Sequence, residues 1–361
     1  TTGVGEVCFN TSMTGYQEIM TDPSYAGQLI TFTFPHIGNT GANRDDIETG
    51  QPFALGMIVR NDVTGPSNWR TTSDLQSWLK AHNMPGIAGI DTRALTRHIR
   101  DNGAPKGALC HRRDGQFDLE SLKQKVESWP GLNGMDLAST VSTEEGYYWD
   151  SSVFDLSANS FPIIDTITAR HKVVAIDYGC KQNILRCLAA AGCDVEVVPA
   201  KTPAAEILAR GPDGIFLANG PGDPAATAAC TKEEITQLLE ADLPIFGICI
   251  GHQLLALAFG CTTVKMDKGH RGANHPVRDL TTGRIEITSQ NHGFMVVEDS
   301  LPEEVEVSHI SLFDGSVEGL RHKNKPVFCV QYHPESSPGP HDSRHLFDQF
   351  AALMDAHKAA K

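Results

Sequence analysis

The sequence lacks the features that would mark a membrane, secreted or nucleic-acid-binding protein. No run approaches the ~20 apolar residues of a membrane span, and no signal peptide is visible. The nine cysteines are scattered, odd in number and without a Cys-x-x-Cys pair, which predicts reduced thiols rather than disulfides or a zinc framework. Basic residues are outnumbered, and the net charge of −14 argues against binding to nucleic acid.

The length of 361 residues predicts two domains, the first of them covering residues 1–150. This part mixes short apolar runs, typical of strands, with helical patterns at 73–80 and 92–100. Ser73 is the expected N-cap of the earlier helix. We therefore expect a smaller N-terminal α+β domain, followed at 151–171 by a linker in which the periodicity weakens.

The second domain, residues 172–361, alternates strands with helix-length segments. Such alternation predicts an α/β domain with a doubly wound, mostly parallel sheet and helices on both faces. Functional sites in these sheets lie at the carboxyl ends of the strands. The expected strands are 172–177, 194–199, 214–217 and 244–248.

The strongest local signal is Gly247-Ile-Cys249-Ile-Gly251, between an apolar strand and an apolar helix. Two glycines around a cysteine permit a tight strand-to-helix turn, the geometry of a nucleophile elbow. The turn presents the sulfur at a helix N-terminus, which stabilises negative charge, and makes the Ile250 N–H a candidate oxyanion donor. A buried structural cysteine is the bland alternative, but the flanking glycines favour a nucleophile.

A thiol nucleophile needs a base, and His333-Pro-Glu335 follows a later apolar strand. A histidine at a strand end can take the thiol proton, and a carboxylate two residues on can orient it. Most of the fifteen histidines are expected to be exposed or structural. A third element, the loop 219–224, reads Asn-Gly-Pro-Gly-Asp-Pro and can point backbone N–H groups at a ligand.

Taken together, the three motifs resemble the class I, triad-type glutamine amidotransferase domain over residues 172–357. The resemblance implies that Cys249 attacks the glutamine amide to form a γ-glutamyl thioester. It implies that His333 moves the protons and that Glu335 orients this histidine. The backbone N–H groups of Gly222 and Ile250 would form the oxyanion hole.

Beyond these motifs, segments across nearly the whole chain are similar to carbamoyl phosphate synthetase small subunits. They include 10–19, 21–25, 34–39, 90–93 and 131–136 in the first domain, and 272–276, 289–294 and 311–315 in the second. About twenty residues that open this family's first domain have no counterpart, so we expect a trimmed start. The family's L-glutamine contacts fall on Ser24, Gly220, Gly222, Ile250, Gln253, Asn291, Gly293 and Phe294. Ser24 comes from the first domain, so the resemblance implies a pocket near the domain interface.

The resemblance implies a cytoplasmic glutaminase subunit that forms a heterodimer with a large carbamoyl phosphate synthetase subunit. This subunit would hydrolyse L-glutamine and deliver ammonia for ATP- and bicarbonate-dependent carbamoyl phosphate synthesis, which serves arginine and pyrimidine biosynthesis. We expect no cofactor or metal on this chain, which has no G-x-x-x-x-G-K-[ST] loop, and we expect ATP and Mg²⁺ on the partner. We expect no nucleic-acid or membrane partner, and the start in mid-strand leaves an organellar targeting segment open.

Three other interpretations stand beside this one. The amidotransferase subunits of anthranilate, GMP or CTP synthesis share the second domain but lack the first. A regulatory subunit with a silent triad is disfavoured by intact Cys249, His333 and Glu335. A cysteine peptidase of similar fold is disfavoured by the 219–224 loop and by the first domain.

Overall fold

A computed structural model describes residues 1–164 and 169–360, so residues 165–168 of the expected linker, and residue 361, lie outside the described part. The chain divides into two compact units. The first comprises residues 1–135 with 266–272, and the second comprises 136–265 with 273–361. The boundary at Met135–Asp136 precedes the expected linker, and the domain limits of the sequence analysis stay a prediction.

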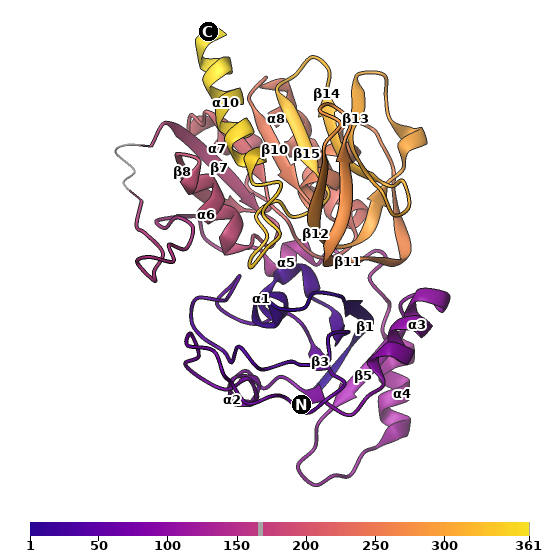
Figure 1. Cartoon of the computed structure of the whole chain (residues 1–361). Helices are drawn as coiled ribbons and strands as arrows, with labels where there is room; N and C mark the ends of the chain where they lie inside the picture. Colours follow the sequence, from indigo (N-terminus) through magenta and orange to yellow (C-terminus); the bar gives the residue numbers. More distant parts are fainter. Residues whose placement is uncertain (165–168, 361) are drawn as a thin grey trace. The chain divides into compact units, whose positions relative to one another are not determined.

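The first unit is built on a five-stranded sheet of order β4-β3-β2-β1-β5 (Figure 1). Neighbouring strands from β4 to β1 are parallel, and β5 is antiparallel to β1. The strands are β1 (Thr2–Asn10), β2 (Gln28–Phe32), β3 (Gly56–Ile58), β4 (Gly86–Ile87) and β5 (Lys106–Cys110). The helical elements are α1 (Tyr16–Thr21), η1 (Pro23–Tyr25), α2 (Leu75–Ala81), α3 (Thr92–Asn102) and α4 (Leu119–Ser128).

Helices cover both faces of this sheet because the strand side chains alternate between two apolar clusters. Ile30 and Phe32 of β2 join residues of α1 and α2, whereas Leu29 joins Ile99 of α3. The expected cap of α2 was wrong by one residue. Its N-cap is Asp74, since the Asp74 carboxylate accepts the Ser77 N–H and starts the helix at Leu75.

The second unit contains a ten-stranded sheet of order β12-β11-β13-β14-β15-β10-β9-β7-β8-β6 (Figure 1). Its five consecutive strands β15, β10, β9, β7 and β8 are parallel, which confirms the expected parallel-rich α/β sheet. Those strands are β7 (His171–Asp177), β8 (Cys193–Pro199), β9 (Gly214–Leu217), β10 (Ile245–Ile248) and β15 (Val327–Val330). The flanking strands are β6 (Tyr147–Tyr148), β11 (Thr263–Asp279), β12 (Ile285–Val296), β13 (Val305–Ser311) and β14 (Val317–His322).

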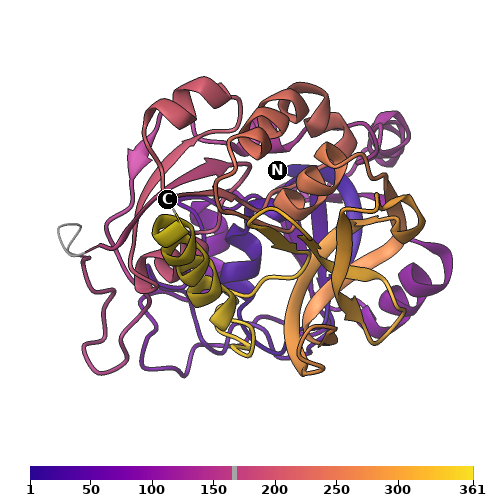
Figure 2. The same ribbon diagram turned by 90° about the horizontal axis from the view of Figure 1, so that it is seen from above.

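Two apolar clusters bury the two faces of the parallel strands. Phe246 of β10 packs with residues of α6 and α10 on one face, and Ile245 packs with residues of α7, α8 and α9 on the other. Figure 2 shows α10, in yellow, on the side of the sheet opposite the salmon helices. The helical elements are α5 (Ala138–Val141), α6 (Gln182–Ala190), α7 (Ala204–Ala209), α8 (Pro224–Glu240), α9 (Ile250–Ala258), η2 (Glu298–Ser300) and α10 (His345–Ala360).

No helix of the described residues has both the length and the apolar character needed to cross a membrane.

Candidate active site

Cys249 occupies the turn between β10 and α9, at the carboxyl edge of the parallel strands. Its φ of 57° and ψ of −107° lie in a region that side chains other than glycine rarely adopt, at a cost of about 1–3 kcal/mol. A Cβ on Gly251 would lie 2.2 Å from the carbonyl oxygen of Leu217, and one on Gly247 would lie 2.9 Å from the backbone carbonyl oxygen of Gly251. The elbow therefore requires glycine at both positions, because the turn presses against β9 and against its own helix.

His333 follows β15 and is held on both its backbone and its ring. Its backbone N–H donates to the Ser289 carbonyl of β12 at 2.9 Å. Its Nδ1 lies 2.8 Å from Oε1 of Glu335, and both side chains are buried. The structure thus brings together the two residues that the sequence analysis paired as base and orienter.

The other ring nitrogen, His333 Nε2, is buried and has no hydrogen bond of normal geometry to a described residue. The Cys249 side chain nevertheless interacts with this imidazole and helps to raise its pKa. The thiol sulfur lies 3.7 Å from the Asn291 carbonyl oxygen, which it can use as a weak acceptor. Catalytic hydrogen bonds are often long before substrate binds, so this arrangement is consistent with proton transfer from sulfur to Nε2.

A lysine that the sequence analysis missed completes the charged cluster. Lys181 Nζ lies 2.8 Å from Glu335 Oε1, and the Lys181 side chain is only 9% exposed. The Lys181 backbone N–H donates to Asn219 Oδ1, and the Asn183 amide donates to the Glu335 carbonyl oxygen. Lys181 stands shortly after β7, so its place beyond the carboxyl end of a parallel strand was the signal that could have found it.

The electrostatics of the cluster favour a protonated imidazole beside an ionised carboxylate. Burial alone would lower the pKa of His333, but the Glu335 carboxylate opposes this, and the net shift is upward. Burial alone would raise the pKa of Glu335, but the charges of Lys181 and His333 outweigh it and hold that pKa below its usual range. A proton taken from the thiol would therefore be stabilised on His333.

The glycine loop lies beside the elbow, because Leu217 at the end of β9 pairs with Gly247 of β10. A Cβ on Gly220 would lie 2.0 Å from the Tyr178 carbonyl oxygen, so the loop packs against the segment after β7. Gly222 has a φ of 93°, which glycine adopts without strain. Ile250 is the first residue of α9, so its N–H is not used by a preceding helical turn. The two candidate oxyanion donors thus belong to adjacent strand ends.

The remaining candidate glutamine contacts of the second unit meet around β12. Gln253 Nε2 of α9 donates to the Phe294 carbonyl oxygen at 2.8 Å and to Gln331 Oε1 at 2.9 Å. Asn291, Gly293 and Phe294 are consecutive or alternate residues of β12, the strand whose Ser289 carbonyl holds His333. Ser24 lies in η1 of the first unit, where its N–H donates to Asp22, and its contact with glutamine stays a prediction.

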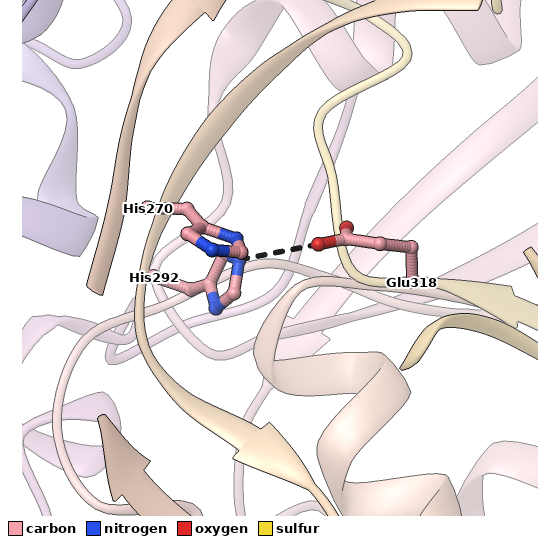
Figure 3. Close-up of side chains that lie close together, drawn as sticks. All are labelled: His270, His292 and Glu318. Carbon is pink, nitrogen blue, oxygen red and sulfur yellow. Dashed lines mark ion pairs between the residues drawn. The ribbon is translucent and has the colours of Figure 1, made fainter. Parts of the chain in front are cut away.

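His292 of β12 and Glu318 of β14 carry side chains of the kind that can bind metals, and both contact other protein groups (Figure 3). His292 Nδ1 is 2.8 Å from the Phe294 carbonyl oxygen, and its Nε2 is 3.9 Å from Glu318 Oε1. Gln290 Nε2 donates to Glu318 Oε2 at 2.8 Å. These contacts support the β12 segment that carries the candidate glutamine contacts. His270, also drawn in Figure 3, comes from the part of β11 that counts with the first unit.

Models of known protein families match both halves of the chain. Residues 174–353 match the family model of glutamine amidotransferase class-I, and residues 1–109 match that of carbamoyl-phosphate synthase small chain, CPSase domain.

Full-length relatives give the same result. The carbamoyl phosphate synthase small chain of Ruegeria pomeroyi is 57% identical over 99% of this chain and 91% of its own length. The protein of the same name from Bradyrhizobium diazoefficiens is 56% identical over 99% of this chain and 90% of its own length. That of Zymomonas mobilis is 57% identical over 97% of this chain and 93% of its own length. The chain belongs to the carbamoyl phosphate synthase small-chain family.

Proposed function

We propose that this chain is the glutamine-hydrolysing subunit of a carbamoyl phosphate synthase. The observation that carries the proposal is the buried arrangement of Cys249, His333 and Glu335 at the carboxyl edge of the parallel strands. The chain also matches carbamoyl phosphate synthase small chains over nearly their whole length. The match of residues 1–109 to the small-chain model favours this enzyme over other amidotransferases.

The proposed reaction proceeds through a thioester. The Cys249 sulfur attacks the side-chain carbonyl carbon of L-glutamine while His333 takes the thiol proton. Collapse of the tetrahedral intermediate breaks the C–N bond, and His333 returns the proton so that ammonia leaves. Water then attacks the thioester carbonyl carbon while His333 takes its proton; the C–S bond breaks, the thiolate takes that proton back, and glutamate is released with the free thiol regenerated. Glu335 holds the imidazole through Nδ1 and stabilises its charged form.

The oxyanion of each tetrahedral intermediate would accept hydrogen bonds from the N–H groups of Gly222 and Ile250. The position of Ile250 at the start of α9 supports this assignment, since the helix dipole adds to the donor. The proposed glutamine contacts are Ser24, Gly220, Gly222, Ile250, Gln253, Asn291, Gly293 and Phe294.

The ammonia is proposed to pass to a large subunit that holds ATP and Mg²⁺ and uses bicarbonate. The name of the relatives, small chain, supports a larger partner. Residues 1–150 are proposed to dock on it and to form part of the ammonia path. The nine free cysteines support a reducing compartment, and we place the complex in the cytoplasm.

The decisive experiment is Cys249→Ser in the complex with the large subunit. Glutamine-dependent synthesis should be abolished, because a serine hydroxyl is a far weaker nucleophile at neutral pH than a base-paired thiol. Synthesis from added ammonia should persist. Near-normal glutaminase activity of this variant would disprove the nucleophile assignment and exclude the proposed reaction.

The docking role is tested by expressing residues ~170–361 alone. Circular dichroism would first establish that the fragment folds. It should then fail to retain the large subunit in a pull-down and should bind glutamine poorly, because Ser24 is absent. Undiminished binding with normal glutamine-dependent synthesis would exclude docking through the first domain.

A further inference from the structure

The first unit contains an open groove of about 820 Å³, and four of the eight residues that line it are arginines. We call it the arginine groove, and its four arginines are Arg60, Arg93, Arg97 and Arg100. It lies at the carboxyl ends of the parallel strands β2 and β3, where Thr33 and Arg60 follow the strands, and residues of α3 line its other wall. Ligands of parallel sheets bind at this edge.

Three of the arginines share one face of α3, because positions 93, 97 and 100 are spaced by four and three residues. All three are exposed, whereas Ile99, on another face of the helix, is fully buried in the core below. The core therefore fixes the orientation of the helix. Neighbouring like charges on one helical face repel each other, so the arrangement gains from an anionic partner.

Only two of the four arginines in the groove form ion pairs with residues that the structure describes. Arg60 pairs with Asp91 at 3.4 Å, and Arg100 pairs with Asp101 at 2.7 Å. Arg93 and Arg97 form no ion pair with a described residue, although Asp101 is near enough to Arg97 to feel its charge. The Thr96 hydroxyl oxygen is buried in the wall of the groove and has no hydrogen-bond partner among the described residues.

The second unit is much more acidic than the first unit, which contains the arginine groove. The first unit carries fourteen Lys and Arg against fifteen Asp and Glu, whereas the second unit carries sixteen against twenty-nine. An acidic partner would therefore be repelled by the second unit and attracted locally by the groove. The two arginines without an ion pair, Arg93 and Arg97, stand about 6 Å apart along the helix, and Arg60 and Arg100 flank them, so the groove offers separate positions for more than one carboxylate of a polypeptide.

We propose that the arginine groove binds an acidic segment of the large subunit, with Arg93 and Arg97 as its principal contacts. This proposal rests on the docking role proposed above for residues 1–150 and names the surface that performs it. A guanidinium group donates two parallel hydrogen bonds to a carboxylate, so aspartates and glutamates on the partner segment would pair with Arg93 and Arg97.

The test compares two double variants of the full-length chain that change its charge equally. Arg93→Glu with Arg97→Glu reverses the groove, and Lys123→Glu with Lys125→Glu reverses two exposed positions on α4 as the control. Titration calorimetry with the large subunit, at low and at physiological salt, gives the dissociation constants. The groove variant should bind at least about tenfold more weakly and lose most of the salt dependence, whereas the control should stay near wild type.

Glutamine hydrolysis by the unpartnered chain should be unchanged in both variants, which also shows that they fold. Arg93→Gln with Arg97→Gln should give an intermediate loss, since it removes the charge without reversing it. Wild-type affinity in the groove variant would overturn this proposal while leaving the docking role intact. No binding by the wild-type chain itself would overturn both. Saturable micromolar binding of inorganic pyrophosphate that the groove variant loses, with unchanged large-subunit affinity, would overturn it in favour of a free-anion site.

Discussion

The substitution Gly251→Ala tests whether the tight elbow positions the nucleophile. A new Cβ would lie 2.2 Å from the Leu217 carbonyl oxygen and 2.8 Å from its carbon, where a real contact requires at least 3.0 Å. Leu217 is backbone of the central strand β9 and cannot rotate away, so the elbow must move by about 1 Å. A displacement of that size at a reacting group costs on the order of 100-fold in rate.

Helix propensity alone gives the opposite expectation. Alanine in place of glycine within a helix stabilises by about 1 kcal/mol. Forcing an extra methyl group into a close-packed position destabilises by about 1–3 kcal/mol, and here the obstacle is backbone, so we expect the clash to win. The free energy of unfolding should therefore fall rather than rise.

Steady-state glutamine hydrolysis and thermal unfolding measure both effects. We expect kcat to fall ~100-fold with a lower Tm, while ammonia-dependent synthesis in the complex stays normal. Gly65→Ala is the matched control, because nothing lies within 4 Å of its added methyl group. A Gly251→Ala protein with wild-type kcat and an unchanged or higher Tm would refute the steric account of the elbow.

Three further outcomes follow from the charged cluster. His333→Asn should nearly abolish glutamine hydrolysis. Glu335→Gln should leave a kcat roughly 10- to 100-fold higher than that of His333→Asn, because it leaves the base in place. Equal losses of kcat in the two variants would mean a more direct role for Glu335. Lys181→Met should lower the free energy of unfolding by about 3 kcal/mol, measured by denaturant titration, since it leaves a buried carboxylate with one cation fewer. Lys181→Met should also move the acid limb of kcat/KM to higher pH. The charge of Lys181 is the largest of the effects that lower the pKa of Glu335 in the folded protein. The stability and activity that depend on ionised Glu335 are therefore present above the usual pKa of a glutamate, and they are lost as the pH falls through the lowered pKa of the folded protein. Without Lys181 the pKa of Glu335 in the folded protein rises, so the acid limb should move to higher pH. An acid limb that stayed in place would contradict this role of Lys181.

The sequence by itself determined the parallel-rich sheet, the elbow and the neighbourhood of His333 and Glu335. These features depend on local patterns. Strand–helix alternation sets the layers, glycines at 247 and 251 permit one sharp turn, and a two-residue spacing at a strand end allows a ring and a carboxylate to meet. Family resemblance added the names of the candidate glutamine contacts but no geometry.

Tertiary structure alone decided what surrounds these motifs. Lys181 lies 154 positions before Glu335, and only the side-by-side order of β7, β9, β10 and β15 brings the two charges to 2.8 Å. The antiparallel extension that carries β12 against His333 was likewise invisible in the pattern, because its half-exposed strands lack a continuous apolar run. In the first unit, the residues of the arginine groove come from three separate segments, and only folding collects their charges. A turn or a side-chain pair formed by neighbouring residues can be predicted from the sequence alone. A contact between distant residues depends on which strands and helices the core places together.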